Sequence, residues 1–497
     1  MFSQKQLFSI VSVIFLTTLL ASAQDITFTQ IDKAIPFGGQ ILVQGDINRD
    51  GYPDLLIGLG DSLNIYTYKS DGKGNYVDWT IPTTFCPSLP LAMGDLQRNG
   101  RNDLLVSGYP NIPCANVNNA GFANYANNGT GIYHPLNRYL LEPYPVQGAV
   151  LADFNSDKKL DMVSIRGPWL ELEYGTGYGN FSAPYKIHTF VGSPASMSGV
   201  YYNLIAGDFD GNGCPDVAWT EFEEVGIRSL QSQLKVAYGD CHGHFSISTL
   251  YDVTGEIDNL QTADLNRDGI SDIVASLDVG GEGVVDPTVQ ISYGQKNRTF
   301  STKLIKDSGF AGYLQVADFN GDGFPDIAYI STSSAAGTVK ILEGNAIQSF
   351  TGSSEYFIAG TNRVPFELVS GDYNRDGRPD LVFLASQIGV AGVTITRLLN
   401  TSTFQSGACV PPVSPGIKVC SPGTSSGTTV DVLAAGTNSN PTVYMELWVD
   451  GVKRVGYGST HELRGTLNLS VGSHRLTYFS FDAAGNENTL DTSLVVN

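Results

Sequence analysis

The chain has 497 residues, of which only 16% are charged, and its formal net charge at pH 7 is −20. Its 56 glycines and its 10% of aromatic residues are typical of an all-β protein with many tight turns. The acidic balance argues against nucleic acid as a partner, because nucleic acids attract basic surfaces.

Residues 1–23 have the pattern of a secretory signal peptide. Lys5 supplies a positive charge, residues 7–20 form an apolar core, and Ala21-Ser-Ala fits a small-x-small cleavage site. A membrane anchor is the alternative, but the apolar stretch is short for a span. We therefore expect cleavage before Gln24 and a protein that is secreted, periplasmic or at the cell surface, with no membrane span.

A nine-residue pattern then recurs along the chain, and its clearest copy is Asp318-Phe-Asn-Gly-Asp-Gly-Phe-Pro-Asp326. Oxygen-bearing side chains stand at positions 1, 3, 5 and 9, and position 6 is glycine. Ca²⁺ takes six to eight oxygen ligands, and a backbone carbonyl at position 7 can add one. Glycine makes the required sharp turn at little cost. An EF-hand closes with glutamate at position 12, but Tyr329 stands there in an apolar run. Asp326 must therefore close the cage, and a strand should follow.

Seven copies of this pattern succeed one another at steps of 49, 58, 55, 56, 54 and 54 residues. Such a ladder indicates an internal repeat. The predicted metal ligands, loop by loop, are Asp46, Asn48, Asp50, Tyr52 and Asp54; Asp95, Gln97, Asn99 and Asp103; Asp153, Asn155, Asp157 and Asp161; Asp208, Asp210, Asn212, Cys214 and Asp216; Asp264, Asn266, Asp268, Ile270 and Asp272; Asp318, Asn320, Asp322, Phe324 and Asp326; and Asp372, Asn374, Asp376, Arg378 and Asp380.

These loops account for the acidity of the chain. They hold 20 aspartates at ligand positions, a number equal to the net negative charge. Seven bound Ca²⁺ ions would add +14 and leave about −6. The alternative is that the loops are ordinary Asp/Asn/Gly turns without metal, because these residues favour turns.

Two of the seven loops depart from the pattern. The loop at Asp95 keeps only two carboxylates, and fewer charges weaken Ca²⁺ binding. The loop at Asp153 has Lys158 where glycine belongs, which predicts a strained turn with a positive charge beside the site.

The repeat unit predicts four antiparallel strands. An apolar strand enters each loop (residues 41–43), another leaves it (residues 55–57), a third alternates (residues 234–238), and an aromatic residue such as Phe245 opens the fourth. Seven such units make a seven-bladed β-propeller. The stretch at residues 26–29 can supply the last strand of the final blade and close the ring.

The units resemble FG-GAP/VCBS repeats, the blades of the integrin α-subunit propeller and of many secreted bacterial proteins. The resemblance covers roughly residues 25–408. It implies Ca²⁺ in the hairpin between the first and second strands of a blade, and it implies that ligands are met on the opposite face.

Six cysteines in an exported chain suggest three disulfides, for which sequence alone allows about 15 pairings. The blade order decides which cysteines share a face, and Cys409 and Cys420 flank a Pro-rich junction. The predicted pairs are Cys86–Cys114, Cys214–Cys241 and Cys409–Cys420. Catalytic or zinc-binding cysteine is the alternative, but the chain has no CxxC motif.

The repeat stops near the C-terminus. We expect a signal peptide at 1–23, the propeller at 24–408, a Pro-rich linker at 409–417 and a β-sandwich at 418–497. The last segment alternates like sandwich strands and suits an immunoglobulin-like domain. Its motifs at Val449-Asp-Gly and Asp482-Ala-Ala-Gly-Asn resemble bacterial Ig-like domains.

No catalytic motif stands out. His242 and His244 form either a metal pair or, as we favour, part of a polar turn. The best ligand candidates are Tyr109, Phe122 and Tyr125 in the long insertion 108–131, where aromatic residues with polar neighbours suit glycan or protein contact. The alternative is a structural cap pinned by a disulfide.

Together these patterns predict a monomeric, secreted, Ca²⁺-binding adhesion or recognition protein for an extracellular glycan or protein. The alternative is a polysaccharide lyase or hydrolase that uses the propeller as its scaffold, with an acid/base pair assembled from different blades.

Overall fold

The computed structural model describes residues 26–35, 41–50, 52–58, 63–71, 76–83, 85, 88–108, 121–140, 144–190, 203–224, 230–278, 287–306, 312–321, 324–331, 337–345, 348–350, 352–359, 363–374, 378–387, 392–402, 415–421, 429–438, 442–450, 452–458, 462–468, 472–482 and 486–496. All regular elements within these ranges are β-strands. No helix that could cross a bilayer is found among them.

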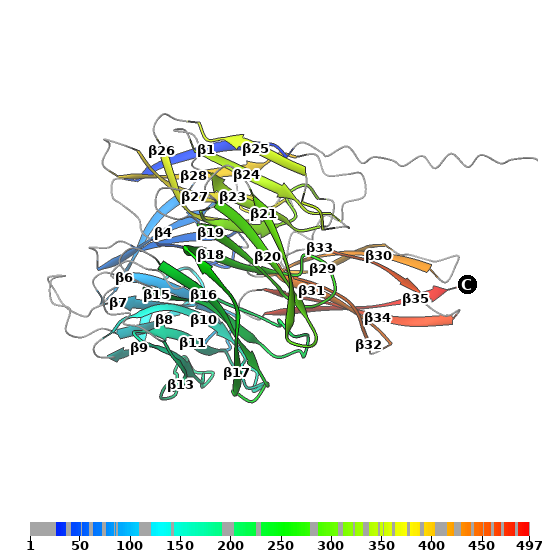
Figure 1. Cartoon of the computed structure of the whole chain (residues 1–497), viewed down its shortest axis with the longest axis horizontal. Coiled ribbons are helices and arrows are strands. Elements are labelled where there is room, and N and C mark those ends of the chain that lie inside the picture. Colours follow the sequence, from blue (N-terminus) through cyan, green and yellow to red (C-terminus); the bar gives the residue numbers. More distant parts are fainter. Residues whose placement is uncertain are drawn as a thin grey trace, which may run out of the picture.

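Residues 28–400 form seven four-stranded antiparallel sheets, the blades of a propeller (Figure 1). Six blades take their strands in chain order. Their strands are β2 (Ile41–Gly45), β3 (Asp54–Gly58), β4 (Asn64–Ser70) and β5 (Tyr76–Pro82) in blade one; β6 (Ser88–Gly94), β7 (Asp103–Gly108), β8 (Gly121–Asn127) and β9 (Tyr133–Leu140) in blade two; β10 (Val146–Ala152), β11 (Asp161–Arg166), β12 (Trp169–Glu173) and β13 (Tyr185–Thr189) in blade three; β14 (Leu204–Gly207), β15 (Asp216–Glu224), β16 (Leu230–Gly239) and β17 (Phe245–Thr254) in blade four; β18 (Glu256–Ala263), β19 (Asp272–Asp278), β20 (Pro287–Gln295) and β21 (Thr299–Lys306) in blade five; and β22 (Leu314–Ala317), β23 (Asp326–Ser331), β24 (Thr338–Glu343) and β25 (Gly352–Phe357) in blade six.

Blade seven closes the ring with both ends of the propeller. It consists of β26 (Arg363–Gly371), β27 (Asp380–Gln387), β28 (Val393–Asn400) and the N-terminal strand β1 (Phe28–Ile35). Strand β1 pairs with β28 from Phe28 opposite Asn400 to Ile35 opposite Val393. The predicted closure is confirmed, although the strand is longer than the predicted residues 26–29. The first strand of each blade lies beside the first strand of the next, and β26 returns to β2.

The blades are held together by cores that neighbouring blades share. One such core joins Val163 and Leu172 of blade three to Val217 and Trp219 of blade four. Because a blade is covered on both faces, its second strand is buried along its whole length, as in β3, β7 and β11. Sequence alternation in these strands therefore does not separate buried from exposed residues.

The prediction of ligand contact is wrong for two residues, because a blade that is covered on both faces buries its inner strands. Phe122 and Tyr125 lie on β8, an inner strand of blade two, and are 0% and 1% exposed. The Phe122 ring stacks on Tyr139 with 4.4 Å between ring centroids. These aromatic residues fill the cores between blades instead of contacting a ligand. Tyr109 lies outside the described residues.

The C-terminal part forms two sheets that share one core, a β-sandwich. Figure 1 shows these strands beside the propeller. Strand β29 begins inside the predicted linker 409–417, and the immunoglobulin-like assignment remains a prediction. One sheet has the order β29 (Gly416–Ser421), β30 (Thr429–Thr437) and β33 (Glu462–Asn468), and the other has the order β32 (Val452–Gly458), β31 (Thr442–Val449), β34 (Gly472–Asp482) and β35 (Glu487–Val496).

Candidate metal centre

Each repeated loop joins the first and second strands of a blade, as predicted. The position 9 residue, which we call the closing aspartate, is the first residue of the second strand. It is fully buried in all seven blades. The seven closing aspartates are Asp54, Asp103, Asp161, Asp216, Asp272, Asp326 and Asp380.

The closing aspartate ties the loop to the rest of its blade. In blade four, Asp216 Oδ2 accepts a hydrogen bond from the backbone N–H of Phe209 at position 2 (2.7 Å). Its Oδ1 accepts from the N–H of Gly239 at the end of the third strand (2.7 Å). The second bond recurs in every blade, with donors Ser70, Asn127, Gly175, Gly239, Gly294, Gly344 and Asn400. The first bond is present in six blades and absent in blade two, where Asp103 Oδ2 has no partner among the described residues. In those six blades two buried backbone groups therefore depend on the closing carboxylate.

The remaining acidic side chains are also fixed by backbone donors. In blade four, Asp208 at position 1 accepts from the N–H groups of Asn212 (3.1 Å) and Gly213 (2.8 Å). Asp210 at position 3 accepts from Asn212 (3.1 Å). These hydrogen bonds form Asx turns, which help to shape the loop.

Position 6 has the left-handed conformation that glycine favours. Gly100, Gly213 and Gly269 adopt φ values of +74°, +82° and +83°. Lys158 adopts φ +63° at the same position of blade three. The predicted strain is therefore present, at a cost of about 1 kcal/mol.

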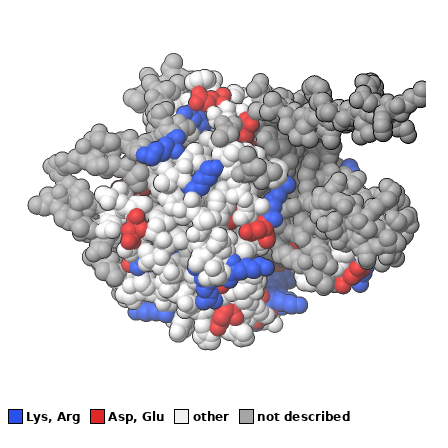
Figure 2. Space-filling model, turned by 45° about the vertical axis from the view of Figure 1, so that its right-hand side comes forward, with Lys and Arg blue, Asp and Glu red and all other residues white. Residues whose placement is uncertain are grey.

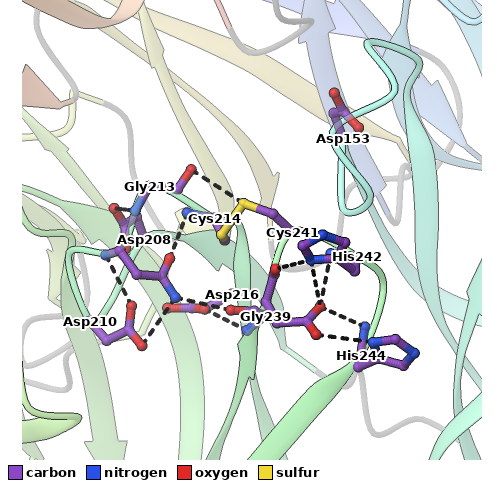
Figure 3. The surroundings of a disulfide bond; sticks show 12 residues. Asp153, Asp208, Asp210, Gly213, Cys214, Asp216, Gly239, Cys241, His242 and His244 are labelled. Carbon is purple, nitrogen blue, oxygen red and sulfur yellow. Dashed lines mark hydrogen bonds and ion pairs between the residues drawn. A yellow bond between two sulfur atoms is a disulfide. The ribbon is translucent and has the colours of Figure 1, made fainter.

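Three carboxylates converge in blade four (Figure 3). Oxygen atoms of Asp208, Asp210 and Asp216 all lie within 4.8 Å of one another. Within the described ranges, no other group of three His, Cys, Asp or Glu residues meets this condition. Most other loops have Asn at position 3, so their predicted ligand sets depend on an amide oxygen.

The buried carboxylates are poorly solvated. The pKa of Asp216 is raised to about 7, mainly by burial and to a smaller extent by the nearby charges of Asp210 and Asp208. Burial likewise raises the pKa of Asp54 to about 8 and that of Asp264 to about 7. A cation among these oxygens would stabilise the ionised form. The all-oxygen donor set fits a hard cation such as Ca²⁺.

A disulfide secures the blade-four loop. Cys214 at position 7 is bonded to Cys241 in the turn between β16 and β17, with an S–S distance of 2.00 Å. The structure therefore contains the predicted pair. Cys86, Cys114 and Cys409 lie outside the described residues, as does the side chain of Cys420, so the other two predicted pairs remain predictions.

The two neighbouring histidines belong to a polar turn. The Nδ1 atoms of His242 and His244 lie 2.7 Å from the carbonyl oxygen and 3.0 Å from the carboxylate of Asp240, respectively. Both side chains are largely exposed (Figure 3). This geometry fits the favoured interpretation of the two residues.

Several loops also contact the next blade through their backbone, which the sequence pattern did not predict. We call the boundary between two neighbouring blades a seam. At several seams, the backbone carbonyl of the position 2 residue accepts a hydrogen bond from the following blade. Gly243 N donates to Phe154 O (3.1 Å), and Gly179 N donates to Leu96 O (3.0 Å). The loops therefore contribute to packing between blades as well as within them.

Some of the loop carboxylates form ion pairs with basic side chains. Arg298, in the β20–β21 turn of blade five, donates through Nε to Asp210 of blade four (2.8 Å). Lys159 Nζ pairs with Asp157 of its own loop at 2.8 Å. Blade four is the only loop with aspartate at position 3. The aspartate at position 3 of blade four was therefore the signal in the sequence for an additional basic partner.

The structure describes most of the predicted ligands in blades six and seven, but not all of them. Asp322 and Asp376 lie outside the described residues. Asp318, Asn320 and Asp326 are nearly or fully buried. On the face that Figure 2 shows, acidic and basic side chains are interspersed, so the net charge of −20 does not form an acidic patch there.

Comparison with known families gives an independent result for this repeat. The profile of the FG-GAP-like repeat matches residues 46–106 and 318–383. The chain contains FG-GAP-like repeats. The matched stretches begin at the opening aspartates of blades one and six and run into the second strand of the following blade. They contain the FG-GAP loops described above.

No curated protein matches the chain. Among solved structures, an Agrocybe aegerita lectin that recognises non-reducing terminal N-acetylglucosamine has a TM-score of 0.43 and 16% identity. That match covers 76% of this chain and 87% of the lectin. The fibronectin(III)-like modules of Clostridium thermocellum CbhA have a TM-score of 0.16 and 11% identity, with 42% of this chain and 85% of theirs covered.

Proposed function

We propose that this FG-GAP repeat protein is a secreted recognition protein whose propeller is stabilised by calcium. The observation that carries the calcium part is the convergence of Asp208, Asp210 and Asp216, with oxygens within 4.8 Å of one another. Burial raises the pKa of Asp216, so a cation would relieve a cost already present in the fold.

Calcium would stabilise the contacts between neighbouring blades. The ion would be held by the oxygens of positions 1, 3, 5 and 9, with the carbonyl of position 7. An ion that binds only the folded state stabilises it. Position 2 of the same loop packs against the next blade, as Phe154 does in the core shared by blades three and four. Calcium would thereby stabilise the whole ring.

The recognition part is supported by large apolar side chains on the outer rim. Val77 and Trp79 stand on the same side of the outer strand β5 and are 62% and 48% exposed. Tyr178, in a turn of blade three, is 79% exposed. Exposed aromatic residues on a rigid scaffold suit contact with a glycan or a protein.

Secretion is part of the same proposal. The Cys214–Cys241 disulfide suits an oxidising compartment. Residues 1–23 lie outside the described residues. N-terminal sequencing of the exported protein should begin at Gln24, and sequencing that begins at Met1 would contradict cleavage.

The experiment that tests the proposal is a retention assay. The exported protein is incubated with a panel of polysaccharides and matrix proteins, with Ca²⁺ or with chelator, and both retention and new reducing or unsaturated ends are scored. We expect Ca²⁺-dependent retention without new ends. New ends would show instead the predicted alternative, a lyase or hydrolase.

A further inference from the structure

A cavity of about 230 Å³ lies between blades four and five at their seam and is open to solvent on one side. Tyr238 on β16 and Ser248 and Thr249 on β17 form one wall. Arg298 and Phe300 of blade five form the other. The cavity lies beside the blade-four loop, because Arg298 also binds Asp210.

Arg298 has a strained backbone, with φ +61°. It stands four residues after Gly294, the donor to the closing aspartate. The equivalent residues in blades two, three and four are all glycines, Gly131, Gly179 and Gly243, with φ between +79° and +81°. A non-glycine residue in this conformation costs about 1 kcal/mol, and blade six also has one at this position, Gln348 with φ +55°.

The guanidinium of Arg298 is held in place by two contacts that leave its terminal nitrogens available. Its Nε donates to Asp210, and its central carbon lies 5.0 Å from the ring centroid of Tyr238. The side chain is 44% exposed. Among the described residues, it makes no other side-chain hydrogen bond, so its two terminal nitrogens are free to bind a ligand in the cavity.

A small residue keeps this seam open. Ser248 lies opposite Val236 in the β16–β17 pair. The equivalent position is Trp79 in blade one, where Lys69 covers the indole ring. In blade five it is Lys303, whose Nζ contacts the backbone carbonyl of Ser349 in blade six (2.9 Å). Blades one and five therefore carry larger side chains at this position, whereas blade six has serine (Ser354) like blade four.

We propose that this cavity binds one sugar residue that carries a carboxylate, such as a uronate at the end of an acidic glycan. This inference rests on the proposed recognition function. A guanidinium binds a carboxylate through paired N–H donors. The hydroxyl groups of Ser248, Thr249 and Thr299 can meet sugar hydroxyls, and Phe300 offers an apolar contact. The volume is below the roughly 300–1,000 Å³ typical of drug-sized ligands, which suits a single ring.

The test is isothermal titration calorimetry on the exported, calcium-loaded protein. The probes are oligosaccharides ending in glucuronate, galacturonate or N-acetylneuraminate, their neutral counterparts, and an oligoglutamate peptide. We expect at least one acidic sugar to bind and its neutral counterpart to bind at least tenfold more weakly. Equal binding of the neutral sugar would overturn the role of Arg298.

Two variants locate the binding site. Ser248→Trp copies blade one and should abolish binding by filling the cavity. Arg298→Gly copies three other blades and should weaken binding at least tenfold. Ser353→Trp makes the same change as the first variant on the exposed outer strand of blade six and should change nothing. Melting temperatures near that of the unmodified protein show that each variant is folded.

Three results would overturn the inference. They are unchanged binding by the folded Ser248→Trp variant, tighter binding of the peptide than of any sugar, and no binding of any acidic sugar. If the unmodified protein is still retained by another glycan or matrix protein, the recognition proposal stands and only the assignment to this cavity fails.

Discussion

The loops of blades three and four share one backbone design but differ in charge. Asp161 and Asp216 each accept a hydrogen bond from position 2 and another from the third strand. In blade three, Lys158 adopts the left-handed turn and Lys159 pairs with Asp157. Blade four has glycine at the turn and three converging carboxylates.

The difference shows that the shape of the loop and its affinity for a cation are separate properties. Backbone donors and Asx turns shape both loops, so blade three keeps the fold while a lysine lies beside one of its acids. Both loops have three acids, but only in blade four do all three lie within 4.8 Å of one another among the described residues, where a divalent cation has most to stabilise. Changes to the ions, the closing aspartates, the disulfide and the turn residues should separate these two contributions.

The largest effect should come from removing calcium at different pH values. Burial raises the pKa of Asp54 to about 8 and those of Asp216 and Asp264 to about 7, well above their unfolded value near 3.8. The folded state therefore holds protons that the unfolded chain releases, and this stabilisation is complete below about pH 4. In chelator, the free energy of unfolding should fall as pH rises from about 4 to about 8.

Denaturant unfolding at several pH values, with chelator and with excess Ca²⁺, measures this dependence. Saturating Ca²⁺ should remove the fall, because the ion replaces the protons. A chelated protein that gains stability between pH 4 and 8 would show that these carboxylates are not held as the structure indicates.

Removing a closing aspartate should have the next largest effect. Asp161→Ala and Asp216→Ala each leave two buried N–H groups without an acceptor, so each should cost about 4 kcal/mol in chelator. In Ca²⁺, the loss should be greater for Asp216→Ala than for Asp161→Ala. The conservative variants Asp161→Asn and Asp216→Asn keep one acceptor and serve as controls. Equal losses of unfolding free energy for the two alanine variants in Ca²⁺ would show that the two loops do not differ in cation binding.

The blade-four disulfide should contribute somewhat less. Cys214 and Cys241 are 27 residues apart, and closing a loop of this length stabilises the folded state by about 3.5 kcal/mol. The double Cys→Ser variant should lose this amount in denaturant unfolding. It should also bind Ca²⁺ more weakly if the bond helps to hold position 7. Unchanged Ca²⁺ affinity would confine its role to stability.

Exchanging the turn residues should give the smallest effect. Lys158→Gly should stabilise the protein by about 1 kcal/mol by relieving the left-handed strain, and Gly213→Lys should destabilise it by a similar amount. Ca²⁺ affinity should rise in the first variant and fall in the second, as calorimetry can measure. No change in either variant would mean that this position does not limit binding.

Much of the fold could be predicted because the regular spacing of the nine-residue loops reveals the repeat. Seven loops at similar intervals predict seven blades, and the blade order predicts the Cys214–Cys241 bond. The glycine rule predicts the strain at Lys158. Each of these inferences needs only residues within one repeat, or the relation of one repeat to the next.

Side-chain exposure and contacts across seams could not be predicted in this way. Phe122 and Tyr125 were placed on a surface because polar neighbours surround them, but a blade covered on both faces buries its inner strands. The Arg298–Asp210 pair joins residues 88 positions apart in successive blades. No pattern within a single repeat shows that the turn of one blade reaches the loop of the blade before it.

The most direct test of the calcium-bound propeller is calorimetric titration of Ca²⁺ into chelated protein. We expect at least four sites, corresponding to the complete loops that open at Asp46, Asp264, Asp318 and Asp372, with weaker binding at Asp95 and Asp153. Blade four should add a further site. Fewer than four sites would contradict the account and would leave the loops as hydrogen-bonded turns without metal.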